Sequence, residues 1–263
     1  MKLLHFNHLQ QFAEIQHFIT TRNNGVSHPP FDSLNLGLHV GDDYEKVIQN
    51  RSFLAENLSI ELQNFCIPQQ IHSNKVAVVT ALDAGKGSMH YDTAIPEVDG
   101  LITAEKNICV MVFAADCALL LFYDVVQKVI AATHAGWRGA VGQIAQNTIL
   151  AMQEKFASKS ENILIGISPC IALEDYEVGE EVENSVFEAY GTIDKYLQIN
   201  PLTHKKHFDL RYTLLQQLLK VGVLAKNIEI NPISTFSHSH TFFSSRKDNG
   251  KTGRFGAGIM LKS

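Results

Sequence analysis

The segment Cys109–Gly139, CVMVFAADCALLLFYDVVQKVIAATHAGWRG, decides how this chain is organised. It contains two apolar runs rich in strand-forming residues, 109–123 and 128–133, which are separated by the hinge DVVQ. Continuous apolar runs of this length are typical of buried strands. Cys117 interrupts the first run and His134 follows the second, so each predicted strand presents a side chain that could take part in catalysis or bind a metal.

The turn after His134, AGWRG, leads into a helix that we expect to begin at about Ala140. The first N–H groups of a helix have no partner within the helix. They would lie beside an imidazole and the guanidinium of Arg138, an arrangement that suits an anion next to a metal or a base.

Strands and helices are interspersed along the rest of the chain. The strand, helix and strand predicted at 128–133, 140–156 and 163–167 succeed one another as in a layered unit of sheets and helices. With no internal repeat and no clear boundary, residues 1–263 are predicted to form a single domain. The other predicted helices are 44–58, 178–190 and 210–221, and the other predicted strands are 18–21, 75–80, 227–235 and 255–261.

Composition excludes several classes of protein. The 263 residues are 45% hydrophobic, enough for a substantial core, and the formal net charge of −5 argues against a broad surface for nucleic acid or anionic membrane. No apolar run is long enough to span a membrane and the start lacks a secretory signal, so we expect a cytosolic location. The four cysteines form no CxxC pair and are predicted to be reduced.

His72, Cys117 and His134 are candidate metal ligands because each lies at the end of a predicted strand or in a link between strands. A catalytic zinc site uses three Cys or His ligands and leaves a fourth position open. Their spacing follows no local motif. Two alternatives stay open at this point: a buried thiol with ordinary histidines, or a nucleophilic Cys117 activated by His72 or His134, with Asp116 beside it.

Several arginines are candidates for binding a phosphate or a ribose. Arg138 lies between two glycines in the first turn of the predicted helix, where a positive charge opposes the helix dipole unless an anion is present. A second basic loop contains Arg246, Lys247 and Arg254, and Arg22 is a weaker candidate. The alternative for all of them is a solvated surface.

His238 and His240 form an HxH pair. On a strand the two imidazoles would face the same side and could share a metal, whereas in a loop they would be exposed polar residues. A multicopper oxidase needs several such pairs together with a Cys-His set, so this pair cannot supply a multicopper centre.

Four motifs together resemble the YfiH-like family, which was once described as multicopper polyphenol oxidases or laccase-domain proteins and is now described as purine nucleoside phosphorylases. The motifs are QIH at 70–72, ADC at 115–117, THAGWRG at 133–139, and FFSSR at 242–246 with TGR at 252–254. The resemblance covers nearly the whole chain and implies an α+β fold, a single domain of mixed β-sheets layered with α-helices.

The resemblance further implies that His72, Cys117 and His134 bind zinc, with copper as a less favoured metal, and form the catalytic centre. The implied reactions are phosphorolysis of adenosine, inosine, guanosine and methylthioadenosine, together with deamination of adenosine. Arg138 and Arg246 are the expected substrate-binding residues, and Asp116 is a candidate proton carrier. The chain departs from the family pattern at Ser234, where relatives often have cysteine, and at Ser245, where an aromatic residue is usual.

Other functions remain as alternatives. One is a cysteine hydrolase or amidase that uses Cys117, with a role in editing cell-wall precursors suggested by a relative of the family. Another is a metal-binding scaffold without catalysis, and a further one is copper-driven oxidation of phenols, which the small number of ligands disfavours.

Overall fold

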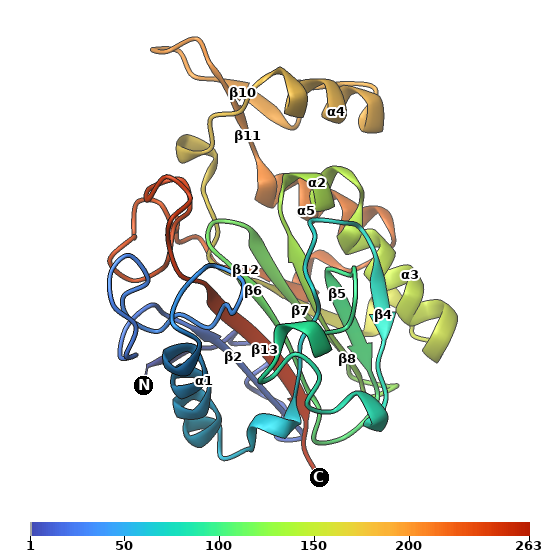
Figure 1. Cartoon of the computed structure of the whole chain (residues 1–263). Coiled ribbons are helices and arrows are strands. Elements are labelled where there is room, and N and C mark those ends of the chain that lie inside the picture. The colour runs from blue at the N-terminus through green and yellow to red at the C-terminus, as the bar shows by residue number, and fades with distance from the viewer. Residues whose placement is uncertain (1) are drawn as a thin grey trace.

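A computed structural model of the chain describes residues 2–263, and in this part of the chain two mixed sheets pack face to face (Figure 1). The first sheet has the strand order β1 (Leu3–Leu4), β2 (Ile15–Thr20), β13 (Phe255–Leu261), β6 (Cys109–Ala114) and β3 (Phe65–Cys66). The second has the order β12 (Ile228–Ile230), β9 (Ile163–Ile167), β7 (Ala118–Asp124), β8 (Val129–Ala135), β5 (Gly100–Thr103) and β4 (Val76–Val78).

Helices cover the outer face of each sheet. Helix α1 (Tyr44–Leu58) lies on the first sheet, and α3 (Ile144–Phe156) and α5 (Leu210–Lys220) lie on the second (Figure 1). The short helix α2 (Trp137–Val141) follows β8 directly. Helix α4 (Glu180–Tyr190) and the hairpin of β10 (Leu197–Ile199) with β11 (Lys206–Phe208) project from one end of the layers (Figure 1).

Alternation of apolar side chains along the central strands explains this four-layer arrangement. Val110 and Val112 of β6 face Leu119 and Leu121 of β7 in the core between the sheets, whereas Leu120 of β7 points to the opposite side, toward α3 and α5. Because both faces of a central strand are buried, its sequence reads as a continuous apolar run. Burial of this kind contributes about 25 cal/mol for each Å² of apolar surface removed from water.

The structure corrects one prediction about the central segment. The first apolar run is two strands, β6 and β7, which belong to different sheets and are joined by the turn 115–117. Asp116 has a φ of +90° in this turn. Both strands are buried on both faces, so the sequence shows no change of pattern where the chain passes from one sheet to the other.

Other boundaries also differ from the prediction. The helix expected over 140–156 begins earlier, at Trp137, and is interrupted at Gly142 and Gln143, where Gln143 has a φ of +67°. The strand expected over 227–235 is confined to β12. The predicted α+β class with mixed sheets layered by helices is confirmed. Within residues 2–263, no helix is both long and apolar enough to cross a membrane.

Candidate metal centre and active-site cavity

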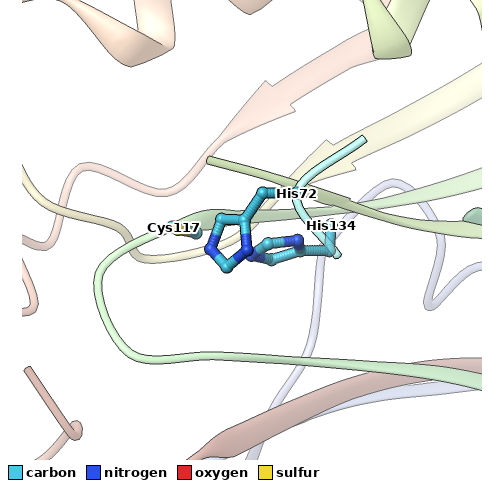
Figure 2. A group of neighbouring side chains, drawn as sticks. All are labelled: His72, Cys117 and His134. Atoms are coloured by element: carbon cyan, nitrogen blue, oxygen red, sulfur yellow. The ribbon is translucent and has the colours of Figure 1, made fainter. Parts of the chain in front are cut away.

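Three side chains that are distant in sequence converge at one end of the second sheet (Figure 2). The ligand atoms of His72, Cys117 and His134 all lie within 4.8 Å of one another. The two imidazole rings are nearly perpendicular, at 88°, with centroids 4.8 Å apart. His72 comes from the link before β4, Cys117 from the turn between β6 and β7, and His134 from the end of β8.

Strand register brings these residues together. In the antiparallel pair β7 and β8, Ala118 lies opposite Ala135, so the same register carried one residue further sets Cys117 opposite Gly136. In the pair β5 and β8, Gly100 lies opposite Thr133. The pairing continues as a bond from the backbone N–H of His134 to the carbonyl of Asp99 (2.7 Å). The end of β8 is therefore fixed from both sides.

Gly136 is required by the close approach of two of these side chains. A Cβ atom at this position would lie 3.0 Å from Sγ of Cys117 and 3.0 Å from Cδ2 of His72, both closer than ordinary van der Waals contact. The glycine has a φ of −77°, which any residue adopts, so space and not backbone conformation makes it necessary here.

We predict that Gly136→Ala weakens metal affinity by about 10-fold, equivalent to about 1.4 kcal/mol, because the added methyl group must push His72 or Cys117 aside. Competition with a chelator of known affinity measures the change. Gly179→Ala is the matched control, since Gly179 is also the N-cap of a helix in an extended conformation and a Cβ atom there would have no neighbour within 4 Å. Equal affinity in the two variants would contradict the prediction.

Asp99 supports both histidines from behind. Its carboxylate is fully buried, and Oδ1 lies 2.9 Å from Nδ1 of His134. The backbone N–H groups of Ile71, His72 and Ser73 donate hydrogen bonds to the same carboxylate. Sequence reasoning missed this residue because it lies in a short turn before β5, and an acidic residue in a turn is usually solvated.

The electrostatics of Cys117 differ from those of the other thiols. Burial opposes the thiolate, but the charge and hydrogen bonds of His134 and His72 outweigh it, so the pKa of Cys117 is lowered. Burial, with a smaller contribution from Asp83, raises the pKa of Cys66 to about 12, and burial raises the pKa of Cys170 to about 11 despite nearby Arg211. Both of these thiols, and Cys109, are buried.

Cys117 and His134 each favour the charged form of the other. Burial opposes the imidazolium, but the Cys117 thiolate and the hydrogen bond to Asp99 raise the pKa of His134. The Asp99 carboxylate is itself kept ionised: burial opposes its charge, and His134 and the donors of Ser73 lower its pKa below the usual value.

The chemistry of these side chains fits a metal ion. A thiolate and two imidazoles are a ligand set that zinc takes when one position is left for water or substrate, and a copper ion also accepts it. Engagement of His134 Nδ1 by a carboxylate is the usual way in which proteins orient a histidine ligand. The three residues lie on the wall of a cavity, so an ion held by them would have an open side.

The cavity has a volume of about 570 Å³, within the usual range for small-molecule sites. It opens between the ends of the two sheets, and residues from six separate segments form its wall. These residues are His39, Gln70, His72, Phe113, Ala114, Ala115, Asp116, Cys117, His134, Ile171, Tyr176, Ser245, Arg246, Asn249 and Arg254.

Two arginines reach the cavity. Arg246 stacks on Tyr176 and donates one bond to the carbonyl of Glu177, and Arg254 donates to the carbonyls of Thr252 and Gly253. Across residues 2–263, neither guanidinium forms a salt bridge with a carboxylate. Each therefore retains unpaired positive charge at the cavity wall, which an anionic ligand could neutralise.

The structure does not bring Arg138 or Arg22 to this cavity. Arg138 is the second residue of the short helix α2, its side chain is 53% exposed, and it pairs with Glu181 at 2.7 Å while stacking on Trp137. This pairing directs the side chain toward α4, which contains Glu181. Arg22 stacks on Phe243 and binds the backbone carbonyls of Asp32 and Ser239.

Asp116 faces the cavity but its carboxylate is already engaged. Oδ1 accepts from the Thr235 hydroxyl (2.6 Å), and Oδ2 accepts from the backbone N–H of Arg246 (2.6 Å). Burial raises the pKa of this carboxyl, although these hydrogen bonds oppose the shift. Asp116 therefore joins the turn that carries Cys117 to the loop that carries Arg246.

The HxH pair predicted as a possible metal site lies outside the cavity. His238 and His240 are exposed in a loop and are not part of the cavity wall, so the predicted alternative of a solvated pair describes their position.

Gln70, which belongs to the QIH motif, forms two hydrogen bonds of 2.8 Å with the backbone of Phe113 and so ties the link that contains His72 to β6. His39 was not predicted; burial and nearby Arg254 lower its pKa to about 4.

Comparison with known proteins gives the family. The family model described as multi-copper polyphenol oxidoreductase laccase matches residues 16–262, nearly the whole chain. The chain belongs to this family. The resemblance to YfiH-like proteins is thus confirmed, and a crystal structure of a hypothetical protein YfiH from Bacillus licheniformis matches with a TM-score of 0.93 and 32% identity, covering 99% of this chain and 96% of that one.

Relatives within the laccase-like family carry the names of enzymes. The purine nucleoside phosphorylase YlmD of Bacillus subtilis is 36% identical over 96% of this chain and 91% of its own length. A purine nucleoside phosphorylase of Bacteroides thetaiotaomicron is 35% identical over 99% of this chain and 96% of its own. An adenosine deaminase, RL5, of an unknown prokaryotic organism is 33% identical over 94% of each chain. These relationships confirm that the protein is an enzyme.

Proposed function

We propose that this protein is a zinc-dependent enzyme that cleaves purine nucleosides with phosphate and also deaminates adenosine. The observation that carries the proposal is the convergence of His72, Cys117 and His134 on a cavity that also contains two arginines without carboxylate partners. The names of the relatives support the same substrates. We propose adenosine, inosine, guanosine and methylthioadenosine as nucleosides, phosphate as the second substrate, and the cytosol as the location.

In this proposal His72, Cys117 and His134 hold the zinc ion. Zinc supplies a Lewis acid and lowers the pKa of a bound water to about 7. The same residues could hold copper, but one thiolate and two imidazoles form a complete three-ligand set for catalytic zinc. We therefore propose zinc as the resident metal.

Phosphorolysis requires phosphate to attack the anomeric carbon of the ribose. A new carbon–oxygen bond forms there, the bond to the purine nitrogen breaks, and the purine leaves with a proton. Arg246 and Arg254 are proposed to hold the phosphate, because fixed guanidinium groups can bind two phosphate oxygens at once. The guanidinium of Arg246 lies over the ring of Tyr176, 5.4 Å from its centroid, which helps to hold this arginine at the wall.

Deamination uses water in place of phosphate. The oxygen of water bonds to the amino-bearing carbon of the purine, and ammonia leaves. Because phosphate takes no part, the two arginines are not needed for this reaction. Asp116, which the cavity exposes, is the residue that we propose to lie near the base, where it also maintains the position of the Arg246 loop.

The test is to incubate purified, metal-analysed protein with adenosine, with and without phosphate, and to identify the products. Adenine with ribose 1-phosphate, formed only when phosphate is present, would support phosphorolysis, and inosine would support deamination. Neither product from protein that contains one zinc per chain would contradict the proposal.

A second candidate is a cysteine hydrolase, and one observation favours it. Asp99, His134 and Cys117 form a chain in which a carboxylate orients an imidazole that in turn lies beside a thiolate. This order of groups is that of a nucleophile, its base and an orienting acid. The two candidates differ in their need for metal: protein stripped with a chelator would lose activity as a zinc enzyme and would retain it as a cysteine hydrolase.

A further inference from the structure

Asp99 has an unusual number of partners for one carboxylate. It is 0% exposed and accepts or shares hydrogen bonds with five groups. Oδ1 lies 2.9 Å from Nδ1 of His134 and accepts from the backbone N–H of His72 (3.1 Å). Oδ2 accepts from the backbone N–H of Ile71 (3.2 Å) and from both the backbone N–H (2.6 Å) and the hydroxyl (2.8 Å) of Ser73.

The contact with His134 determines which ring nitrogen is free. Since Nδ1 faces the carboxylate, it carries the proton of the hydrogen bond, and Nε2 remains as the nitrogen available to a metal ion beside Cys117. The ring is also held against rotation because His134 is 3% exposed and its backbone N–H is bound to the carbonyl of Asp99. One residue thus sets both the tautomer and the orientation of this imidazole.

The contacts with the 71–73 segment determine the position of the second histidine. His72 has a φ of +62°, a region that residues other than glycine rarely adopt and that needs support from the surroundings. Three successive backbone N–H groups point to the Asp99 carboxylate and provide that support. Without them, the exposed His72 would have no fixed position relative to Cys117.

We infer that Asp99 is a positioning residue that sets both histidines for a metal ion, so that the affinity of the centre depends on a carboxylate outside the ligand set. This inference rests on the proposed metal centre. Charge supports it as well: a divalent ion, the Cys117 thiolate and the Asp99 carboxylate sum to zero. Loss of the carboxylate would leave a buried net positive charge, which is unfavourable in a site removed from water.

The test is Asp99→Asn, which preserves the size of the side chain. An amide has one acceptor oxygen where the carboxylate has two, so its NH₂ group must face either His134 or the N–H groups of 71–73. We expect zinc affinity to fall about 10- to 100-fold, measured by competition with a chromophoric chelator. We also expect the absorption spectrum of the cobalt-substituted protein to change, which a loss of stability alone would not cause.

Two variants act as controls. Ser73→Ala removes one bond to Oδ2 and leaves the contacts with His134 and His72, so its zinc affinity should stay within about threefold of the wild type. Asp124→Asn alters another fully buried carboxylate, at the far end of β7, which accepts two backbone N–H bonds. It should lower thermal stability without changing zinc affinity.

The outcomes separate this inference from the proposed function. If wild-type protein binds zinc and folded Asp99→Asn binds it equally well, the inference is wrong and the metal centre stands. If the wild type takes up no zinc, both are wrong. Should Asp99→Asn fail to fold, NMR of histidine-labelled, zinc-loaded wild-type protein decides: a proton on Nδ1 of His134 supports the inference, and a proton on Nε2 overturns it.

Discussion

Cys117→Ser is expected to remove the metal and to lower kcat/KM for adenosine phosphorolysis by on the order of 10²- to 10⁴-fold. A serine hydroxyl does not ionise near neutral pH, so it cannot replace the thiolate whose charge the two histidines stabilise. Zinc content and initial rates on the same preparation provide the measurement. A Cys117→Ser protein with full zinc and normal rates would show that this thiol is not a ligand.

Cys66→Ser is the matched control for this variant. Cys66 is also buried, but it lies in the core between the sheets and is not part of the cavity wall. A buried hydroxyl without a partner costs about 1–3 kcal/mol, so the control should be less stable while retaining zinc and activity.

His72→Ala separates the two proposed chemistries. His72 is exposed, so its removal should not disturb folding, and a zinc enzyme would lose a ligand and most of its activity. A cysteine hydrolase built on Cys117, His134 and Asp99 would keep its nucleophile, base and orienting acid. Activity that survives both this substitution and chelation would identify the thiol mechanism.

Arg254→Met is expected to reduce phosphorolysis by about 10²- to 10³-fold, mainly through a higher KM for phosphate. Methionine keeps part of the apolar stem, which packs against Gly37, while it removes the charge. Deamination of adenosine by the same variant should change little because that reaction uses no phosphate. The measurement is the ratio of adenine to inosine formed at a fixed phosphate concentration.

Arg138→Met provides the comparison. Arg138 was predicted from sequence to bind substrate, but its guanidinium pairs with Glu181 on the surface, so the variant should resemble the wild type in both reactions. If phosphorolysis instead depends on Arg138 and not on Arg254, the assignment of the phosphate site to the cavity is wrong. An equal fall of both reactions in Arg254→Met would place that arginine beside the nucleoside.

The sequence was informative where a side chain able to bind a metal or act as a nucleophile lies within or directly after a buried apolar run. Cys117 stands within an apolar run and His134 follows one, and such positions at strand ends in a layered fold converge at one edge. His72 was a candidate because it lies in a link between predicted strands, and the family resemblance then supported all three residues as ligands. The three residues were therefore found without any knowledge of strand register.

Asp99 was not predicted, and Arg254 was only one of several candidate arginines, because their contacts depend on distant parts of the chain. Asp99 receives donors from 71–73 and lies opposite His134, which is fixed by the pairing of β5 with β8. The pairing of Arg138 with Glu181 is also a contact between distant segments, and the helix that carries Arg138 begins three residues before the predicted start. Helix boundaries are the least reliable part of a structure predicted from the pattern of hydrophobic residues.

The pairing of β7 with β8 has a mechanical consequence for the metal centre. Cys117 directly precedes β7 and His134 lies in β8, so the second sheet carries both, whereas His72 comes from the link before the edge strand β4. A bound ion would fasten that link to the centre of the sheet and would stabilise the protein by mass action. Mutations that loosen the link would then be detected first as loss of metal and only later as unfolding.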